Sequence, residues 1–320
     1  MCTYNGEKFL RGQLASIAQQ SRSPHELVIC DDGSTDSTPA IVEEFSRTAG
    51  FPVRFVRNPV NLGSTKNFEK ALSLCHGDFI ALCDQDDIWL PQKLARQSET
   101  MERDSELGGV FCDGQLMQGS SRQDKGRLWA ALLFTPGKQK RFNDGEAASV
   151  LLAGNVVTGA TLMFRGSLRS FILPIPAVWV HDGWIAWMLV FHSKLRAMDT
   201  PLIQYRIHDG QQIGIDRTSS GHLPLKKRLE VARREEAAKH MAAVVEFEEL
   251  RQRASEIGSP RSLSDIHAID GKIRFLQVRG AEYKNRRDRL VQILRNTHNY
   301  SRYERSFKDL IRDISIVLLA

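Results

Sequence analysis

The first 84 residues alternate short apolar runs with amphipathic segments, and this alternation constrains the fold more than any other feature of the chain. Apolar side chains recur at helical spacing in 7–20, 37–47 and 63–75. Strand-like apolar runs fill 25–34, 52–58 and 78–84. This order predicts an α/β fold: a Rossmann-like, mostly parallel sheet flanked by helices.

The rest of the chain is less regular. Residues 108–145 are rich in Gly, Gln and Arg and are typical of loops with short strands. A strongly apolar helix is expected within 176–194, and amphipathic helices from 221 onward. We therefore expect one domain at 1–215 and a basic helical C-terminal extension at 216–320. No run of 18 uninterrupted apolar residues indicates a membrane span.

The positive charge is concentrated in the C-terminal third. Residues 221–320 contain 21 Lys and Arg against 14 Asp and Glu, whereas the whole chain has a net charge of +6. Such a surface attracts an anionic membrane, an acidic partner or nucleic acid, and a solvated helical surface is the alternative. Five cysteines without a CxxC pair fit buried thiols in a reducing compartment.

Three polar segments lie at or just past strand ends: 2–6 (CTYNG), 31–36 (DDGSTD) and 84–87 (DQDD). Taken singly, DDGSTD fits a turn with a helix N-cap, and DQDD fits a turn. Ligands of open α/β sheets, however, bind outside the carboxyl ends of the strands. The three segments together predict a shared site.

Asp84, Asp86 and Asp87 bring three carboxylates together after an apolar run. Like charges repel and burial raises the cost of ionisation, so a metal ion, a neighbouring cation or solvent must offset that cost. Asp182 stands just before the apolar helix, where it could act as an N-cap. Tyr205, Arg206 and His208 come at the end of a strand-like run.

Four ordered segments resemble glycosyltransferase family 2, which has the GT-A fold: CTYNGEKFLRGQLASIAQQS, DDGSTDST, NLGSTKNFEKAL and DFIALCDQDDIWLPQKL. The resemblance spans about 2–215. The DQDDIW form, the later HD and the YRxH strand are most similar to the rhamnosyltransferase-like bacterial members, which build lipopolysaccharide O-antigen, capsule and other cell-surface glycans. The family resemblance implies that the protein transfers a sugar from a nucleoside-diphosphate sugar, with inversion at the anomeric carbon.

The resemblance also implies roles for the acids. Asp84 would face the ribose and the metal-bound water, and Asp86 would bind a divalent cation, Mg²⁺ or Mn²⁺. His208 would reach the metal or the diphosphate, with a structural histidine as the alternative. Asp182 would be the general base that takes the proton of the acceptor hydroxyl.

Further residues are implied for the nucleotide. After the first and second strands they are Thr3, Tyr4, Asn5, Asp31 and Asp32. Along the pocket they are Asn61, Gly63 and Lys66, with a surface lysine as the alternative for Lys66.

The chain departs from the family pattern in two ways. It lacks the Gln-x-x-Arg-Trp signature of processive members, so transfer of a single sugar is expected. The apolar residues that normally precede CTYNG are missing, so we expect either a misassigned start or a truncated first strand.

The expected donor is a dTDP-, UDP- or GDP-sugar, and the expected acceptor is a cell-surface glycan or a lipid-linked sugar. We expect a cytoplasmic protein, peripheral on the inner face of the cytoplasmic membrane, with no nucleic acid as partner. A non-catalytic nucleotide-sugar-binding partner in a glycan assembly complex is one alternative. A sugar nucleotidyltransferase is another, although CTYNGEKF lacks the glycine-rich basic loop that would bind a triphosphate.

Overall fold

The computed structural model describes residues 1–119, 126–208, 225–281, 283, 285–304, 306 and 308–319. The chain divides into two compact units. The first unit contains Met1–Gly145 and Val156–Ile215, and the second contains Glu146–Asn155 and Asp216–Ala320. Residues 146–155, which lie inside the predicted 1–215 domain, thus group with the C-terminal helices.

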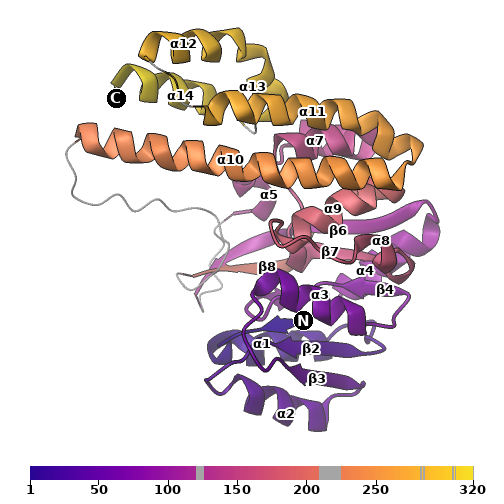
Figure 1. The fold of residues 1–320 in the computed structure, drawn as a ribbon. Coiled ribbons are helices and arrows are strands. Elements are labelled where there is room, and N and C mark those ends of the chain that lie inside the picture. Colours follow the sequence, from indigo (N-terminus) through magenta and orange to yellow (C-terminus); the bar gives the residue numbers. More distant parts are fainter. Residues whose placement is uncertain are drawn as a thin grey trace. The chain divides into compact units, whose positions relative to one another are not determined.

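A parallel sheet begins the first unit, and its strand order is β1-β2-β3. Its elements alternate along the chain (Figure 1): β1 (Cys2–Thr3), α1 (Glu7–Ala18), β2 (Leu27–Asp31), α2 (Thr38–Thr48), β3 (Val53–Arg57) and α3 (Ser64–Leu74). The register pairs Cys2 with Cys30 and Ile29 with Phe55. Every residue of β2 is buried, which explains its unbroken apolar run.

A second, mixed sheet has the order β4-β7-β6-β8-β5. Its strands are β4 (Phe79–Ala81), β5 (Ile88–Trp89), β6 (Leu107–Gln118), β7 (Leu162–Arg165) and β8 (Lys194–Ile207). Only β6 and β8 pair in parallel; β4–β7, β6–β7 and β5–β8 are antiparallel. The α/β fold is therefore confirmed, with its purely parallel part limited to β1–β3.

The two sheets meet at the centre of the first unit. The Cys2 amide donates to the Cys83 carbonyl, and Leu82 donates to Leu162, so the chain between β4 and the DQDD segment joins both sheets. This places the carboxyl ends of β1, β2 and β4 at one edge, as the strand order predicts.

Further helices of the first unit cover the second sheet. They are α4 (Lys93–Arg103), α5 (Leu128–Ala131), α6 (Pro136–Arg141), the short π-helical turn η1 (Phe142–Glu146), α8 (Arg169–Ile172) and α9 (His181–His192), with 3₁₀ turns η2 (Gly159–Thr161) and η3 (Gly166–Leu168). Ten of the twelve residues of α9 are buried, so this helix lies in the core. The strand β6 corrects the prediction of loops with short strands for 108–145.

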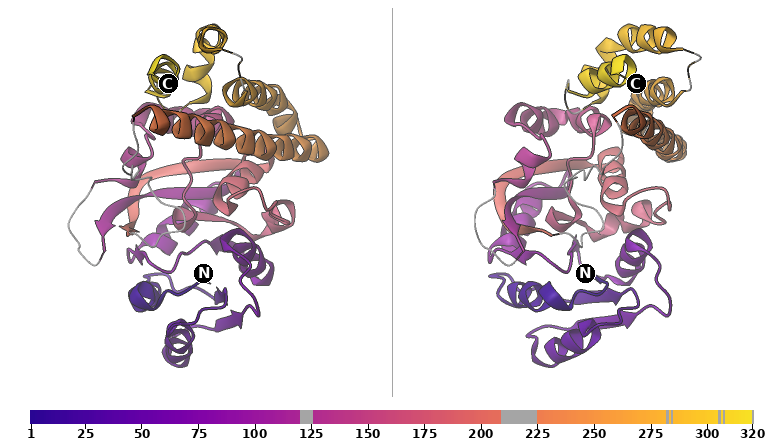
Figure 2. Two further views of the ribbon diagram at one scale, coloured as in Figure 1. Left: turned by 60° about the vertical axis from the view of Figure 1, so that its left-hand side comes forward. Right: turned by 90° about the vertical axis from the view of Figure 1, so that its left-hand side faces the viewer.

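The second unit is helical. It contains α7 (Ala147–Ala153), α10 (Leu225–Ile257), α11 (Pro260–Gly280), α12 (Arg286–Arg295), α13 (Thr297–Tyr303) and α14 (Lys308–Leu319). Figure 2 shows α10 and α11 side by side from two directions. Arg279 on α11 forms a buried ion pair with Asp313 on α14, with Arg279 Nε 2.7 Å from Asp313 Oδ2. No helix within the described residues has the length and apolarity needed to cross a membrane.

Candidate functional site

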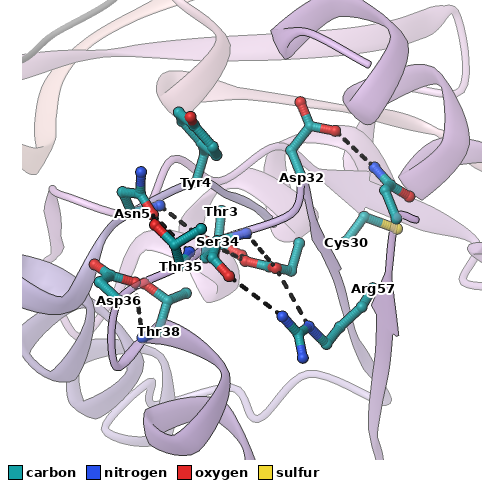
Figure 3. Close-up of polar contacts among 12 residues, drawn as sticks. Thr3, Tyr4, Asn5, Cys30, Asp32, Ser34, Thr35, Asp36, Thr38 and Arg57 are labelled. Atoms are coloured by element: carbon teal, nitrogen blue, oxygen red, sulfur yellow. Dashed lines mark hydrogen bonds and ion pairs between the residues drawn. The ribbon is translucent and has the colours of Figure 1, made fainter. Parts of the chain in front are cut away.

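The segments after β1 and β2 are held together by side-chain hydrogen bonds (Figure 3). Asn5 Oδ1 accepts from the Thr35 amide at 2.9 Å, and the Asn5 amide donates to Ser34 Oγ at 2.8 Å. The Gly6 amide donates to Thr38 Oγ1. Asn5 has a φ of 47°, which asparagine tolerates better than most residues. CTYNG and DDGSTD therefore form one interlocked loop pair.

Asp31 lies inside this loop pair and is fully buried. Its carboxylate accepts from Thr3 Oγ1 at 2.9 Å and from the Ser34 amide and hydroxyl. Arg57 Nε lies 3.7 Å from Asp31 Oδ2. These contacts give both Thr3 and Asp31 partners within the loop.

Asp32 holds the next loop, which leads into α3. Its Oδ1 accepts from Asn58 Nδ2 and the Leu62 amide, each at 2.8 Å, and its Oδ2 accepts from the Gly63 amide at 2.9 Å. Asn61 Nδ2 donates to the Asp32 carbonyl. Gly63 has a φ of 79°, which favours glycine at this turn. The structure thus brings Asp32, Asn61 and Gly63 together, and their role in nucleotide binding stays a prediction.

Gln85, which was not predicted as a site residue, connects the DQDD segment to the first loop. Its Oε1 accepts from the Tyr4 amide at 2.9 Å, and its Nε2 donates to the Tyr4 carbonyl at 3.0 Å. The Tyr4 ring is exposed and points away from the Asn5–Thr35 contact (Figure 3). A long amide side chain between two acids was the only signal in the sequence.

Asp84 and Asp86 differ in their surroundings. Burial, followed by the charges of Asp86 and Asp182, raises the pKa of Asp84 to about 7. Asp86 Oδ2 instead lies 2.8 Å from Nε2 of His208, which follows β8. Asp182, which contributes to the raised pKa of Asp84, follows Asp84 by 98 positions in the chain.

Asp87 is buried and supports the strand that carries His208. Its Oδ1 accepts from the Arg206 amide at 2.9 Å, and the Arg206 side chain donates to the carbonyls of Asp86 and Gly119. Burial and the nearby Asp86 and Asp84 raise the pKa of Asp87 well above its usual range. Asp87 therefore has a structural role at the end of β8, and its surroundings disfavour the charged form of its carboxyl.

Asp182 occupies the first turn of α9 but not its N-cap position, which is Val180. Its Oδ2 accepts from the Gly159 amide at 3.2 Å, so the side chain reaches across to η2. Beside it, the His181 ring stacks on Phe68 with the ring centroids 3.9 Å apart. Burial lowers the pKa of His181 to about 3, so this ring is neutral.

Lys66 has two hydrogen-bond partners within the protein. Its Nζ donates to Glu69 Oε2 at 2.8 Å and to the Ile175 carbonyl at 2.7 Å.

Tyr205 was not predicted as a site residue, but the charges of four site acids affect the pKa of its hydroxyl group. Burial and the charges of Asp87, Asp84, Asp86 and Asp182, in that order, raise its pKa.

The pair Asp86 and His208 suits a divalent cation. Mg²⁺ and Mn²⁺ bind carboxylate oxygens, and both ions keep waters or take substrate phosphates in the remaining positions. The described part of the chain contains no group of three or more His, Cys, Asp or Glu side chains arranged to hold a metal. A cation here would therefore have at most two protein ligands from the described residues.

The family model for glycosyl transferase family 2 matches residues 1–164, which include all the loops at the carboxyl ends of β1, β2 and β4. The chain belongs to this family. Family 2 membership confirms the family resemblance of the four sequence segments; the rhamnosyltransferase-like subtype remains a prediction.

Two relatives illustrate the family 2 match. The uncharacterized protein Rv1520 of Mycobacterium tuberculosis is 38% identical over 167 residues, which cover 51% of this chain and 45% of that protein. The E. coli UDP-Glc:alpha-D-GlcNAc-diphosphoundecaprenol beta-1,3-glucosyltransferase WfgD is 35% identical over 101 residues, 32% of this chain and 39% of that protein. Each match covers less than half of the relative's length.

Solved structures share the fold over a longer stretch. The S. aureus TarS 1–349 structure in complex with UDP-GlcNAc has a TM-score of 0.55 at 17% identity and covers 99% of this chain and 89% of that one. The mannosyltransferase PcManGT from Pyrobaculum calidifontis, in complex with GDP-Man and Mn²⁺, has a TM-score of 0.52 at 13% identity and covers 99% and 82%. These likenesses support the fold of this family 2 protein.

Proposed function

We propose that this protein is an inverting glycosyltransferase that moves a single sugar from a nucleoside-diphosphate sugar to a hydroxyl group of a cell-surface glycan or a lipid-linked acceptor. One observation carries the proposal: the turn η2 links the segments of the two acids. The Gly159 amide in η2 donates to Asp182 Oδ2 in the first turn of α9. The Leu162 carbonyl, directly after η2, accepts from the Leu82 amide, two residues before Asp84. A candidate base and a candidate donor-binding acid therefore share one site, as a single-displacement transfer requires.

The donor would bind across the interlocked loops. The remaining acceptor capacity of Asp32 would receive the N–H of a uracil or thymine base, with Thr3, Tyr4 and Asn5 alongside. Asp84 would face the ribose, and Asp86 with His208 would hold Mg²⁺ or Mn²⁺ at the diphosphate. Such a cation neutralises the charge that develops on the diphosphate leaving group.

Asp182 would orient the acceptor and take its hydroxyl proton. One of its oxygens accepts from Gly159, which fixes the carboxylate in place. Inversion follows because the acceptor oxygen attacks the anomeric carbon opposite the departing diphosphate. The base must lie on the acceptor side of the sugar, and Asp182 comes from a different element than the acids of the DQDD segment.

The DQDDIW, HD and YRxH segments support dTDP-rhamnose as the donor, with UDP- and GDP-sugars as competitors. The relative WfgD is named for a diphosphoundecaprenol acceptor, which supports a lipid-linked acceptor here. Such an acceptor would bring the protein to the cytoplasmic face of the membrane.

A surface on α12 supports membrane attachment. Arg287, Val291, Leu294 and Arg295 are exposed and lie on one side of the helix, with Leu294 52% exposed. Apolar side chains between arginines favour binding to an anionic lipid surface, where each Lys or Arg contributes about 1 kcal/mol to the binding free energy.

Sedimentation with phosphatidylglycerol vesicles at low salt tests this surface. The wild type should sediment with the vesicles, and the double variant Arg287→Glu/Arg295→Glu should not. Equal sedimentation of the wild type and the double variant would reject this surface.

A nucleotide panel tests the catalytic proposal. Calorimetry with dTDP, UDP and GDP in the presence of Mn²⁺ or Mg²⁺ should reveal one preferred nucleotide. The matching donor sugar, with a lipid-linked acceptor, should then release free nucleoside diphosphate. Binding without release for every donor and acceptor would instead indicate a non-catalytic nucleotide-sugar-binding protein.

A further inference from the structure

We propose that Lys66 and Glu69 on α3 are positioning residues for the general base, because together they clamp the backbone of Ile175 and so fix the segment 175–182 that carries Asp182. This inference rests on the proposed function of Asp182. It assigns Lys66 to the acceptor side of the reaction, in place of a contact with the donor.

The clamp holds both polar groups of one residue. Lys66 Nζ donates to the Ile175 carbonyl at 2.7 Å, and Glu69 Oε2 accepts from the Ile175 amide at 2.6 Å. Lys66 Nζ and Glu69 Oε2 also pair with each other at 2.8 Å. Hydrogen bonds to charged groups are stronger than neutral ones, and two of them on one residue restrict both its position and its orientation.

Two more contacts from α3 follow the segment toward the base. Thr65 Oγ1 donates to the Trp179 carbonyl at 3.0 Å. The Phe68 ring stacks on His181, which is 6% exposed and has no hydrogen-bond partner for either ring nitrogen among the described residues. Residues 175, 179 and 181 are therefore each held by α3, immediately before Asp182.

Gly159 of η2 also holds Asp182. Its amide donates to Asp182 Oδ2, and a Cβ placed on Gly159 would lie 2.9 Å from His181 Nε2. This close approach leaves no room for a side chain at 159. The base is thus fixed between η2 and the residues presented by α3.

The same helix is anchored to the donor side. The Leu62 and Gly63 amides just before α3 donate to Asp32, and Asn67 Nδ2 donates to the Cys30 carbonyl at 2.9 Å. Because α3 is one rigid helix that contacts both the Asp32 loop and the segment before Asp182, it fixes the distance between them. The clamp is the link between α3 and the segment of the base.

The test compares Glu69→Ala and Lys66→Met with the rescue variant Lys66→Arg, which keeps the charge and the donor capacity. Glu99→Gln, in the exposed pair with Arg103 on α4, is the matched control.

Hydrogen exchange of the peptide spanning 173–182 should speed up in Glu69→Ala and Lys66→Met. The Kd of the preferred nucleoside diphosphate should stay unchanged, while kcat should fall about 10- to 100-fold through misplacement of the base. Lys66→Arg and Glu99→Gln should resemble the wild type.

Two results would overturn the inference. The first is unchanged exchange of 173–182 in Glu69→Ala. The second is a weaker nucleoside diphosphate Kd in Lys66→Met but not in Glu69→Ala, which would make Lys66 a phosphate ligand. If the wild type transfers no sugar from any donor, the proposed function fails, yet the exchange experiment still decides whether the clamp exists.

Discussion

The imidazole Nε2 of His208 lies 2.8 Å from Oδ2 of Asp86, although 122 positions separate the two residues in the chain. The antiparallel pairing of β5 with β8 brings the end of β8 to the DQDD segment. The Arg206 amide donates to Asp87, and this contact fixes the end of β8 two residues before His208. This pair is the best candidate for a two-ligand cation site in the described protein.

Removing either member of the pair should weaken nucleotide binding only when the cation is present. We expect Asp86→Asn and His208→Ala to raise the Kd of the preferred nucleoside diphosphate by at least about tenfold in Mn²⁺, since metal-site substitutions commonly have effects of this size. Calorimetry with Mn²⁺ and with EDTA measures this. Equal Kd values for the wild type in the two buffers would show that no cation takes part in binding.

Asp87→Asn should behave differently from Asp86→Asn. Burial and the nearby acids raise the pKa of Asp87, so they disfavour a charge at this position, and a neutral amide has nearly the same shape as the carboxyl. Its Oδ1 can still accept from the Arg206 amide. Nucleotide Kd and thermal midpoint should remain near those of the wild type. A loss as large as that of Asp86→Asn would mean that Asp87 acts as a charged ligand.

Asp182→Asn should separate binding from chemistry. The amide oxygen can still accept from Gly159, but it cannot take a proton, so kcat should fall about 10²- to 10⁴-fold. Nucleoside diphosphate binding, measured by calorimetry, should not change. Asp144→Asn, in an exposed pair with Lys140, is the control. A variant with wild-type kcat would require another base.

His181 should make the protein sensitive to acid. Its pKa is about 3 in the folded state and about 6.5 in an unfolded chain. Between these values the unfolded chain binds a proton that the folded protein does not, so the free energy of unfolding decreases as the pH falls. At pH 5 the loss from this residue is about 2 kcal/mol at most.

Urea unfolding at pH 7.5 and pH 5 tests this expectation. The difference in stability between the two pH values should be smaller in His181→Gln than in the wild type. Part of the difference should persist, because burial and the Arg279 charge also lower the pKa of His240 to about 3. The exposed His25→Gln variant should keep the full difference. If the unfolding free energy of His181→Gln depended on pH as it does in the wild type, protonation of His181 would not destabilise the folded protein.

The sequence predicts the elements of the N-terminal half well, because each has a regular pattern of its own. The helix expected at 7–20 is α1 (Glu7–Ala18), and the strand expected at 52–58 is β3 (Val53–Arg57). The long strand β6 was missed because its glycines and Asp113 are typical of loops. A Cβ on Gly108 would lie 1.9 Å from Ser193 Oγ, so close packing within the fold, and not a turn, requires glycine there.

The sequence by itself determined which polar segments follow which strands, and hence the family and the edge of the sheet where a ligand binds. These properties depend on residues close together in the chain, where periodicity and turn chemistry act. Only the tertiary structure decided the partner of each side chain: Asp86 with His208, Asp32 with Leu62 and Gly63, and Lys66 with Ile175. Each of these contacts spans 30 to 122 positions. They arise from strand pairing and helix packing across the whole unit, which no local pattern encodes.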